Sequence, residues 1–140
     1  MMRINDFNLT PRAKKTYKSA KNFAMDNSHS LINNSHLFYG CLENLSEDLN
    51  LSLEINECLI SQSDIKSLII KYSKRNPNKF YTESFENKWH EETEIISSYA
   101  QKLSEVYEND YIGIEHIFLT ILDNSDDFCE FLSSHGILIK

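Results

Sequence analysis

Histidine and glutamate are neighbours at two places in this sequence, and each place raises the question of metal binding or acid–base chemistry. The stretch WHEETE, residues 89–94, begins like the HExxH zinc pattern, but Glu94 stands where the second histidine is required. Glu115 and His116 are adjacent, so on a helix they point about 100° apart and cannot hold one ion together. We therefore expect no metal site and no cofactor, and we interpret these charges as residues of helix N-termini.

A cysteine nucleophile with a histidine base is the other chemistry to consider. Cys41 follows His36 by five residues, which places the two on different faces of a helix. Cys58 and Cys129 are far away, no CxxC pair occurs, and all three cysteines lie among apolar residues. Free cysteines of this kind behave as small hydrophobic residues and are typical of a reducing cytoplasm. The sequence thus predicts a cytoplasmic protein that is not an enzyme.

The chain is acidic, with 14 lysines and arginines against 21 aspartates and glutamates and a formal net charge of -7. Nucleic acid and anionic membranes would repel such a surface, so neither is predicted as a partner. Its 140 residues, 41% of them hydrophobic, suit one compact domain. No signal peptide is visible, and no apolar run approaches the roughly 20 residues of a membrane-spanning helix.

Apolar residues recur at helical spacing, and only 3 glycines and 2 prolines interrupt them, so an all-α fold is predicted. Thr10-Pro11 is a helix start, because threonine caps free N–H groups and proline suits the first helical position. The segment LEINECLI, residues 53–60, fits either a brief helix or an extended piece. The helices are expected at about residues 11–26, 34–44, 47–53, 65–72, 87–107, 113–122 and 128–132. The helix at 87–107 is expected to direct these residues inward: Trp89, Ile96, Tyr99, Ala100, Leu103 and Val106.

The order of long helix, turn, core helix and short helix occurs twice in the chain. Shifting the sequence by 80 positions aligns Ala20 with Ala100, Ile32 with Ile112, His36 with His116, Phe38 with Phe118, Leu42 with Leu122 and Asn44 with Asn124. No gap is needed between residues 20 and 44, so an internal duplication is the best explanation. We expect a single domain over 1–140, with repeat one at about 9–73, a linker at about 74–86 and repeat two at about 87–140.

The second copy contains YIGIEHIFLTIL, residues 111–122, which resembles the signature of the Clp N-terminal repeat. The stretch LTPRAKKTYKSAKNFA, residues 9–24, resembles the segment that opens that repeat. Two such repeats form the N-terminal domain of ClpA/ClpB/ClpC-type AAA+ unfoldases, and the resemblance, nearest to ClpC-like members, covers about residues 9–137. It implies a pseudo-twofold all-α bundle of two four-helix repeats. The second repeat reaches Lys140 without room for its last helix, so part of its apolar surface is expected to be less covered.

The resemblance implies a domain that binds substrate or adaptor proteins for a Clp-type ATPase and does no chemistry itself. Consistent with that role, the chain has no GxxxxGK[ST] phosphate loop. The alternative is a freestanding relative that regulates an unfoldase or serves another interaction, with no ATPase on its own chain.

The resemblance also indicates a binding site near the start of each core helix. In ClpC-like members a glutamate there helps to bind phosphoarginine, because paired N–H···O bonds match a guanidinium group to a carboxylate. Glu115 occupies that position in repeat two, whereas repeat one has Ser35. Loss of one of two carboxylates argues against phosphoarginine binding in the ClpC manner, although half of the site could remain. Thr10 is kept before the opening helix of repeat one, where repeat two has His90.

Two further groups of residues have more than one interpretation. His36 and His116 open the two core helices, either as buried histidines that hydrogen-bond a turn or as ligand contacts. The predicted groove between the repeats is lined by Ser35, His36, Glu115 and His116. An aromatic cluster around the linker would form a peptide-binding patch if part of it were exposed. That cluster consists of Phe80, Tyr81, Phe85 and Trp89.

Overall fold

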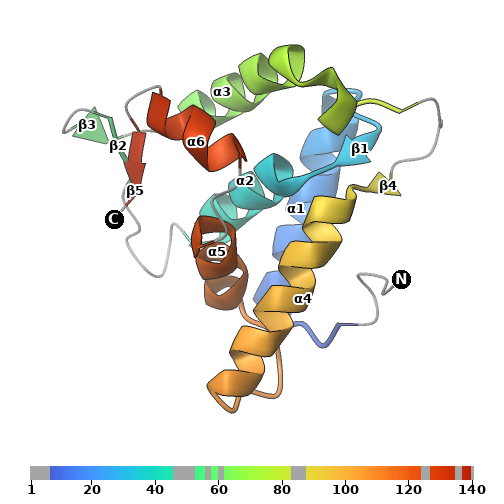
Figure 1. Ribbon diagram of the computed structural model, residues 1–140, viewed down its shortest axis with the longest axis vertical. Helices are drawn as coiled ribbons and strands as arrows, with labels where there is room; N and C mark the ends of the chain where they lie inside the picture. Colours follow the sequence, from blue (N-terminus) through green and yellow to red (C-terminus); the bar gives the residue numbers. More distant parts are fainter. Residues whose placement is uncertain are drawn as a thin grey trace.

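The computed structural model describes residues 7–45, 53–55, 58–59, 62–82, 88–123, 127–134 and 137–139. It is a bundle of helices with short strands at two sides (Figure 1). The helices are α1 (Pro11–Asp26), α2 (Asn34–Leu45), α3 (Gln62–Arg75), α4 (Glu91–Val106), α5 (Ile114–Asp123) and α6 (Asp127–Ser134), with a 3-10 turn, η2, at Pro77–Lys79. The strands are β1 (Leu31–Ile32), β2 (Leu53–Ile55), β3 (Cys58–Leu59), β4 (Lys88–Trp89) and β5 (Ile137–Ile139). The predicted all-α class is confirmed, because these strands are too short to form a layer.

Helix α1 begins and ends where the sequence predicted. Thr10 accepts a hydrogen bond from the Ala13 N–H at 3.1 Å, and Pro11 occupies the first helical position. The buried face of α1 consists of Ala13, Thr16, Tyr17, Ala20, Phe23 and Ala24. Small residues on this face let α2 approach closely, and a Cβ atom at Gly40 of α2 would collide with the Thr16 carbonyl oxygen. The α1–α2 contact therefore depends on a residue without a side chain.

Helix α4 begins at Glu91 rather than at the predicted Asn87. The residues before it are extended instead, because β4 pairs in parallel with β1 in the register Leu31 with Lys88 and Ile32 with Trp89. His90 then caps the helix by accepting a hydrogen bond from the Glu92 N–H at 3.1 Å. Trp89, expected inside the helix, packs edge-on against Tyr17 with ring centroids 5.5 Å apart. The pairing with a distant strand overrides the local helical pattern.

The orientation of α4 also differs from the prediction. Tyr99 and Val106 were expected in the core but are 44% and 74% exposed. The buried face instead consists of Thr93, Ile96, Ser97, Ala100 and Ser104. Small polar residues line this face, where the Ser97 hydroxyl meets that of Tyr17. Their hydroxyl groups are satisfied locally; Ser97, for example, donates to the Thr93 carbonyl at 2.8 Å. The apolar side chains that turn outward are described below.

Contacts between equivalent residues show that the two halves of the chain face each other around a pseudo-twofold axis. The Tyr17 hydroxyl and the Ser97 hydroxyl, 80 positions apart, lie 2.5 Å from each other. The rings of Phe38 and Phe118, also 80 apart, have centroids separated by 5.5 Å. The turns after α1 and α4 likewise match, since Ser28 and Glu108 both have positive φ, at 59° and 57°. The division into a linker at 74–86 and flanking repeats stays a prediction.

The core is centred on α2 and α5, as predicted. Phe38 of α2 contacts Phe128 of α6 at a centroid distance of 5.5 Å, and Phe128 contacts Tyr72 of α3 at 5.2 Å. The described parts of the segment 53–60, residues 53–55 and 58–59, are extended, because β2 pairs antiparallel with both β3 and β5. The helix predicted at 47–53 lies outside the described residues, apart from Leu53 in β2.

Among the described residues, repeat two has no counterpart of α3, and α6 is followed instead by β5 (Figure 1). The consequence is visible at two equivalent positions. Tyr39 of α2 is only 5% exposed, and Lys66 of α3 lies over its ring at 5.2 Å. Leu119 of α5, the equivalent residue, is 47% exposed. This agrees with the expectation that the apolar surface of repeat two is less covered.

Candidate binding surfaces at the ends of the core helices

Two backbone junctions between the repeats hold the predicted site residues. At the first, residues 8–10 and 112–116, the Thr10 N–H donates to the Ile112 carbonyl at 3.0 Å and the Ile112 N–H donates to the Asn8 carbonyl at 2.7 Å. We name this the α5 junction. At the second, residues 30–36 and 88–92, the His90 N–H donates to the Ile32 carbonyl at 2.8 Å. We name this the α2 junction. Each joins the extended segment before a long helix to the extended segment before a core helix.

The two junctions lie at opposite ends of α1 and α4. Helix α1 starts at the α5 junction and leads to the α2 junction, and α4 runs the other way. Because both helices have 16 residues, the separation is about 24 Å at 1.5 Å per residue. Ser35 and His36 therefore lie at one end, while Thr10, Glu115 and His116 lie at the other. The structure does not bring the predicted residues together in one groove.

His36 and His116 have the same structural role. The Nδ1 atom of His36 accepts the Asn33 N–H at 2.9 Å, and Nδ1 of His116 accepts the Gly113 N–H at 2.8 Å. Each histidine is the third residue of its helix, so it reaches back to the cap residue as the glutamate of a capping box does. Both side chains are buried, at 0% and 5% exposure. Of the two interpretations, the structure favours that of buried residues holding a turn.

Ser35 is also buried, and its hydroxyl is not available to a ligand. The Asn33 side-chain oxygen accepts from the Ser35 N–H at 2.9 Å and from the Ser35 hydroxyl at 2.5 Å. The Asn33 side-chain nitrogen in turn donates to the Lys79 carbonyl at 2.8 Å. Asn33 thus caps α2 and anchors the end of η2, at Lys79, to the start of that helix. In repeat one the cap residue Asn33 supplies the oxygen acceptor. In repeat two the equivalent cap residue is Gly113, and a carboxylate follows two residues later, at Glu115.

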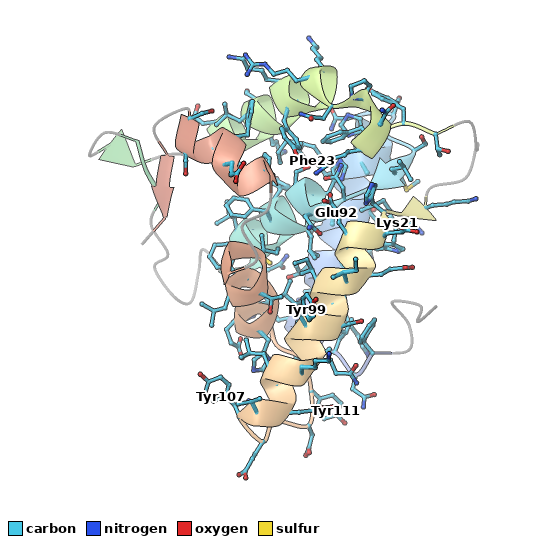
Figure 2. The ribbon with its side chains drawn as sticks, viewed as in Figure 1. Lys21, Phe23, Glu92, Tyr99, Tyr107 and Tyr111 are labelled. Atoms are coloured by element: carbon cyan, nitrogen blue, oxygen red, sulfur yellow. The ribbon has the colours of Figure 1, made fainter. Side chains whose placement is uncertain are left out.

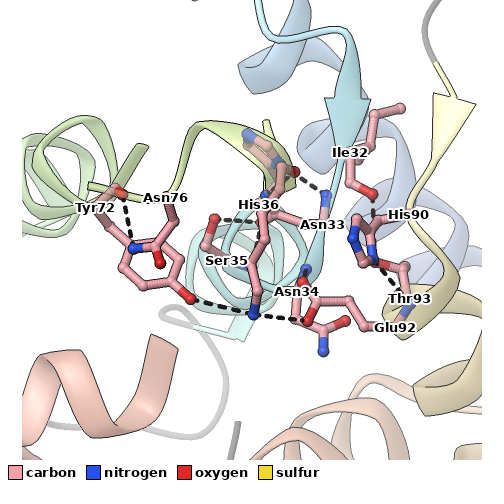
Figure 3. A network of polar contacts seen from close by, with 11 residues as sticks. Ile32, Asn33, Asn34, Ser35, His36, Tyr72, Asn76, His90, Glu92 and Thr93 are labelled. Carbon is pink, nitrogen blue, oxygen red and sulfur yellow. Dashed lines mark hydrogen bonds and ion pairs between the residues drawn. The ribbon is translucent and has the colours of Figure 1, made fainter. Parts of the chain in front are cut away.

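A carboxylate that the sequence did not indicate lies at the α2 junction (Figure 3). Glu92 of α4 accepts from the Asn34 N–H at 3.4 Å and pairs with the Lys79 ammonium at 3.3 Å. Lys79 also donates to the Tyr72 hydroxyl at 3.4 Å. Beside this network the Asn34 side-chain oxygen is buried, and it has no partner within the described part of the chain. The N-terminus of α2 is therefore already occupied by a charged group from the other repeat.

The N-terminus of α5 is more open. Glu115 is exposed, and its carboxylate folds back over Gly113, where a Cβ atom would stand 2.5 Å from Oε1. Within the described ranges, the amide groups of Ile114, Glu115 and His116 donate to no protein acceptor. Thr10 is half-buried nearby and uses its hydroxyl to cap α1. The α5 junction therefore offers a carboxylate and free helix N–H groups side by side.

The remaining chemistry considered from the sequence finds little support. Cys41 is buried, and burial raises the pKa of its thiol far above the ordinary range. Both ring nitrogens of His36 are engaged, one by the Asn33 N–H and the other by His29. In the described residues, no group of three or more histidine, cysteine, aspartate or glutamate side chains could hold a metal ion. No helix there has the length and apolar character needed to cross a membrane.

The predicted aromatic cluster around the linker is mostly covered. Phe80 is fully buried and Trp89 is half-buried, so Tyr81, 48% exposed, is the most accessible of the described members. Phe85 lies outside the described residues. The larger exposed apolar surface is on α4 and α5 and includes Tyr99 and Val106, which the sequence pattern assigned to the core.

The two halves of the pseudo-twofold bundle meet at the α2 and α5 junctions, and the predicted site residues lie at these junctions. The sequence matches the family model of the Clp repeat (R) N-terminal domain over residues 8–135, so the chain belongs to the Clp N-terminal domain family, as predicted. Domains of this family are non-catalytic protein-interaction domains of Clp ATPases. A search of curated proteins finds no match.

The fold is similar to the crystal structure of the N-terminal domain of the caseinolytic protease associated chaperone ClpD from Arabidopsis thaliana. The TM-score is 0.69 at 18% sequence identity, over 92% of this chain and 87% of that chain. At this identity the similarity shows the fold alone. The closer resemblance to ClpC-like members stays a prediction.

Proposed function

We propose that this domain docks substrate or adaptor proteins for a Clp-type unfoldase and that repeat two supplies the docking surface. The surface, which we name the apolar stripe, consists of Ile95, Tyr99 and Val106 of α4 and Leu119 of α5. These side chains are 52%, 44%, 74% and 47% exposed. Figure 2 shows Tyr99 on the outer side of α4, with Tyr107 and Tyr111 beyond the end of the helix. Helix α5 packs directly against α4. The repeat-one equivalents of Tyr99, Val106 and Leu119 line one cleft, so these three residues are expected to share a face. Ile95 precedes Tyr99 by four residues and lies on the same side of α4.

The observation that supports this proposal is the difference between the repeats. At the equivalent positions repeat one has Lys15, Ser19, Asp26 and the buried Tyr39. Three of these, Ser19, Asp26 and Tyr39, line a small polar cleft of about 170 Å³ between α1, α2 and α3. The same backbone face is thus polar in repeat one and largely apolar in repeat two, where Lys102 lies over the Tyr99 ring. Single exposed apolar residues are ordinary, whereas a continuous group on one face is typical of an interaction site.

The size of the stripe indicates weak, reversible binding. Complete burial of one aliphatic or aromatic side chain contributes about 1.5–3 kcal/mol. Because the stripe residues are on average about half covered, covering the rest contributes roughly 4 kcal/mol in total, before the costs of association. This free energy corresponds to a dissociation constant of about 1 mM, so binding by the stripe alone is weak and reversible, which suits a domain that must pass its clients on.

Charges around the stripe indicate what kind of segment it accepts. Glu91, Glu105, Glu108 and Asp110 are exposed on α4 and the following turn, and Lys102 is the one exposed basic residue among residues 91–111, all of which are described. An acidic rim attracts segments that combine apolar and basic side chains and repels acidic ones. We therefore propose apolar, basic client segments as the preferred ligands.

Binding of a labelled amphipathic peptide of leucine and lysine, followed by fluorescence anisotropy, tests the stripe. The double variant Tyr99→Ser, Val106→Asp introduces the residues that repeat one has at these positions. We expect it to bind roughly 30-fold more weakly, since it removes about half of the apolar contact, or about 2 kcal/mol. Ile70→Ser, which changes a 37% exposed residue of α3, is the matched control and should bind like the wild type. Equal affinity of all three proteins would contradict the proposal.

The α5 junction is the better candidate for recognition of an arginine or phosphoarginine side chain. It combines the exposed Glu115 carboxylate with free N–H groups at a helix N-terminus, which suit a guanidinium group and a phosphate respectively. At the α2 junction Ser35 is buried, and Glu92 already occupies the helix N-terminus. We therefore propose that any such binding involves one site rather than two.

Calorimetry with phosphoarginine and with a phosphoarginine peptide tests this part of the proposal. Binding at one site, lost in Glu115→Ala and kept in Glu105→Ala, is the expected result, because Glu105 is an equally exposed carboxylate on α4. Two equivalent sites, or binding that survives Glu115→Ala, would contradict it. No binding at all would leave the apolar stripe as the docking surface, and the peptide assay above would then decide on its own.

A further inference from the structure

Two buried histidines at the α2 junction form a direct hydrogen bond that the docking function does not require. His29 lies in the turn after α1, and its Nδ1 atom is 2.9 Å from Nε2 of His36. The residues are 2% and 0% exposed. A histidine pair without solvent is an unusual choice for a purely structural contact, because an apolar or amide pair would not depend on pH.

The hydrogen bonds around the pair fix where its protons lie. Nδ1 of His36 accepts the Asn33 N–H at 2.9 Å, so the His36 hydrogen must be on Nε2. Nε2 of His36 therefore donates to Nδ1 of His29. A second proton on either ring would put two donors face to face, at His29–His36 or at His36–Asn33. The arrangement is stable only while both rings are neutral.

The pair lies beneath residues 79–82, which are the last residue of η2 and the three residues after it. Phe80 packs edge-on against both imidazoles, with centroids 4.8 Å from His29 and 5.2 Å from His36. The segment is anchored by the Leu31 N–H, which donates to the Phe80 carbonyl at 3.0 Å, and by the Thr82 N–H, which donates to the Ser30 hydroxyl at 2.7 Å. Any change at the histidine pair is therefore transmitted to this segment.

Repeat two has no such pair. At the position equivalent to His29 it has Asn109, whose side chain lies 3.3 Å from Nε2 of His116. Asn109 is exposed, and an amide does not take up a proton in the physiological range. The two junctions share the same backbone bonds, and each holds a buried histidine whose Nδ1 accepts a cap N–H, but at the position of His29 the α5 junction has an amide.

We propose that His29 and His36 form a proton-sensitive latch that holds residues 79–82 over the α2 junction and releases them on mild acidification. Burial lowers the pKa of both histidines below the ordinary 6.5, and the neighbouring His29 lowers the pKa of His36 further. The unfolded chain then binds protons more readily than the folded one. Stability is complete above about pH 6.5 and declines as the pH falls below that value.

Other titratable groups lie on the surrounding elements. Glu92 of α4 and Lys79 pair with each other at 3.3 Å, and Lys79 also contacts the Tyr72 hydroxyl of α3. His90, which caps α4 at the same junction, accepts the Glu92 N–H on Nδ1 at 3.1 Å. Tyr81 packs edge-on against His29 at 5.6 Å. On α1 and α2, Asp26 and Tyr39 line the cleft on the far side of Phe23. Ordinary tyrosine and lysine side chains have pKa values near 10 and carboxyl groups near 4, so histidines are the groups that change charge between pH 5 and 7, and the variant His29→Asn separates the pair from His90.

The first measurement is denaturant unfolding between pH 5 and 7.5, followed by the fluorescence of Trp89, the one tryptophan in the chain. The folding constant of the wild type should fall below pH 6.5 by up to roughly ten-fold per pH unit for each excluded proton. His29→Asn, which copies repeat two, should flatten this dependence. Parallel profiles for the wild type and His29→Asn would overturn the proposal.

Hydrogen exchange tests the local character of the release without any variant. After correction for intrinsic rates, the Leu31 and Thr82 amides at the latch should lose more protection between pH 7.5 and 5.5 than the Thr10 and Ile112 amides, because the latch excludes protons from two buried rings rather than one. Imidazole nitrogen shifts should show His36 neutral at pH 6 with its proton on Nε2. Equal loss of protection at both junctions, or a His36 already protonated at pH 6, would refute the latch even if His29→Asn failed to fold.

Discussion

Replacing Gly40 with alanine is expected to destabilise the domain by about 2 kcal/mol, although alanine is the better helix former. Gly40 lies within α2, where alanine alone would add about 1 kcal/mol of helix stability. A Cβ atom there, however, would overlap the Thr16 carbonyl oxygen of α1 and stand 3.3 Å from both the Thr16 carbonyl carbon and its methyl group. The helix backbone cannot yield as a flexible side chain does, so α1 and α2 must move apart.

The expected loss follows from these opposing effects. Overpacking of a well-formed contact costs about 1–3 kcal/mol and more where backbone has to move, so we take about 3 kcal/mol against the gain of about 1 kcal/mol. The difference corresponds to a decrease in Tm of about 8 °C for a chain of this size. Gly113→Ala is the matched control, because its Cβ atom would meet only the movable Glu115 carboxylate. It should cost less than about 1 kcal/mol, mainly through a weaker helix cap.

Thermal and denaturant unfolding of the three proteins checks this reasoning. A Gly40→Ala variant as stable as the wild type, or one no less stable than Gly113→Ala, would show that α1 and α2 do not approach as closely as the structure indicates. The close approach also positions Tyr17 against the second repeat, so the result bears on the pseudo-twofold packing as a whole.

Three further outcomes are expected. Tyr17→Phe removes the hydrogen bond to Ser97 and should lower the free energy of unfolding by about 1 kcal/mol, since Ser97 keeps its bond to a helix carbonyl. An unchanged free energy in denaturant unfolding would show that the two hydroxyl groups are not in contact. Asn33→Ala removes the cap of α2 and should cost about 1–2 kcal/mol, against less than about 0.5 kcal/mol for Ser28→Ala in an exposed turn. Cys41, buried and with a raised pKa, should resist iodoacetamide at pH 8 in the native protein and react after unfolding; rapid native labelling, mapped by mass spectrometry, would contradict its placement.

The sequence correctly predicted those elements whose limits depend on neighbouring residues. Thr10-Pro11 starts α1 as predicted, and the core helices lie close to their expected limits, because capping and helical periodicity are properties of neighbouring residues. The shift of 80 positions also places Tyr17 opposite Ser97, although the sequence alone did not reveal that equivalent residues touch. The family resemblance depended on that repeat, and it is confirmed.

The features that sequence analysis missed all depend on distant contacts. Helix α4 starts late because Lys88 and Trp89 pair with β1, more than 50 residues away. The same pairing brings Glu92 to the N-terminus of α2, where it takes a position that Ser35 left without a carboxylate. Tyr99 was assigned to the core because apolar residues usually face inward, yet α4 buries its small polar face instead. Comparison of each residue with its partner 80 positions away would have shown these exchanges of polar and apolar character.

Site-specific photocrosslinking is the most direct test of docking by repeat two. A photoreactive phenylalanine analogue would replace Tyr99 in one protein and Ser19, its equivalent in repeat one, in another. Both would be irradiated with an unfolded, basic client polypeptide in the presence of the full Clp-type unfoldase. The docking account predicts crosslinks from position 99, diminished by Val106→Asp, and few from position 19. Equal crosslinking at both positions, or crosslinking at position 19 alone, would contradict it.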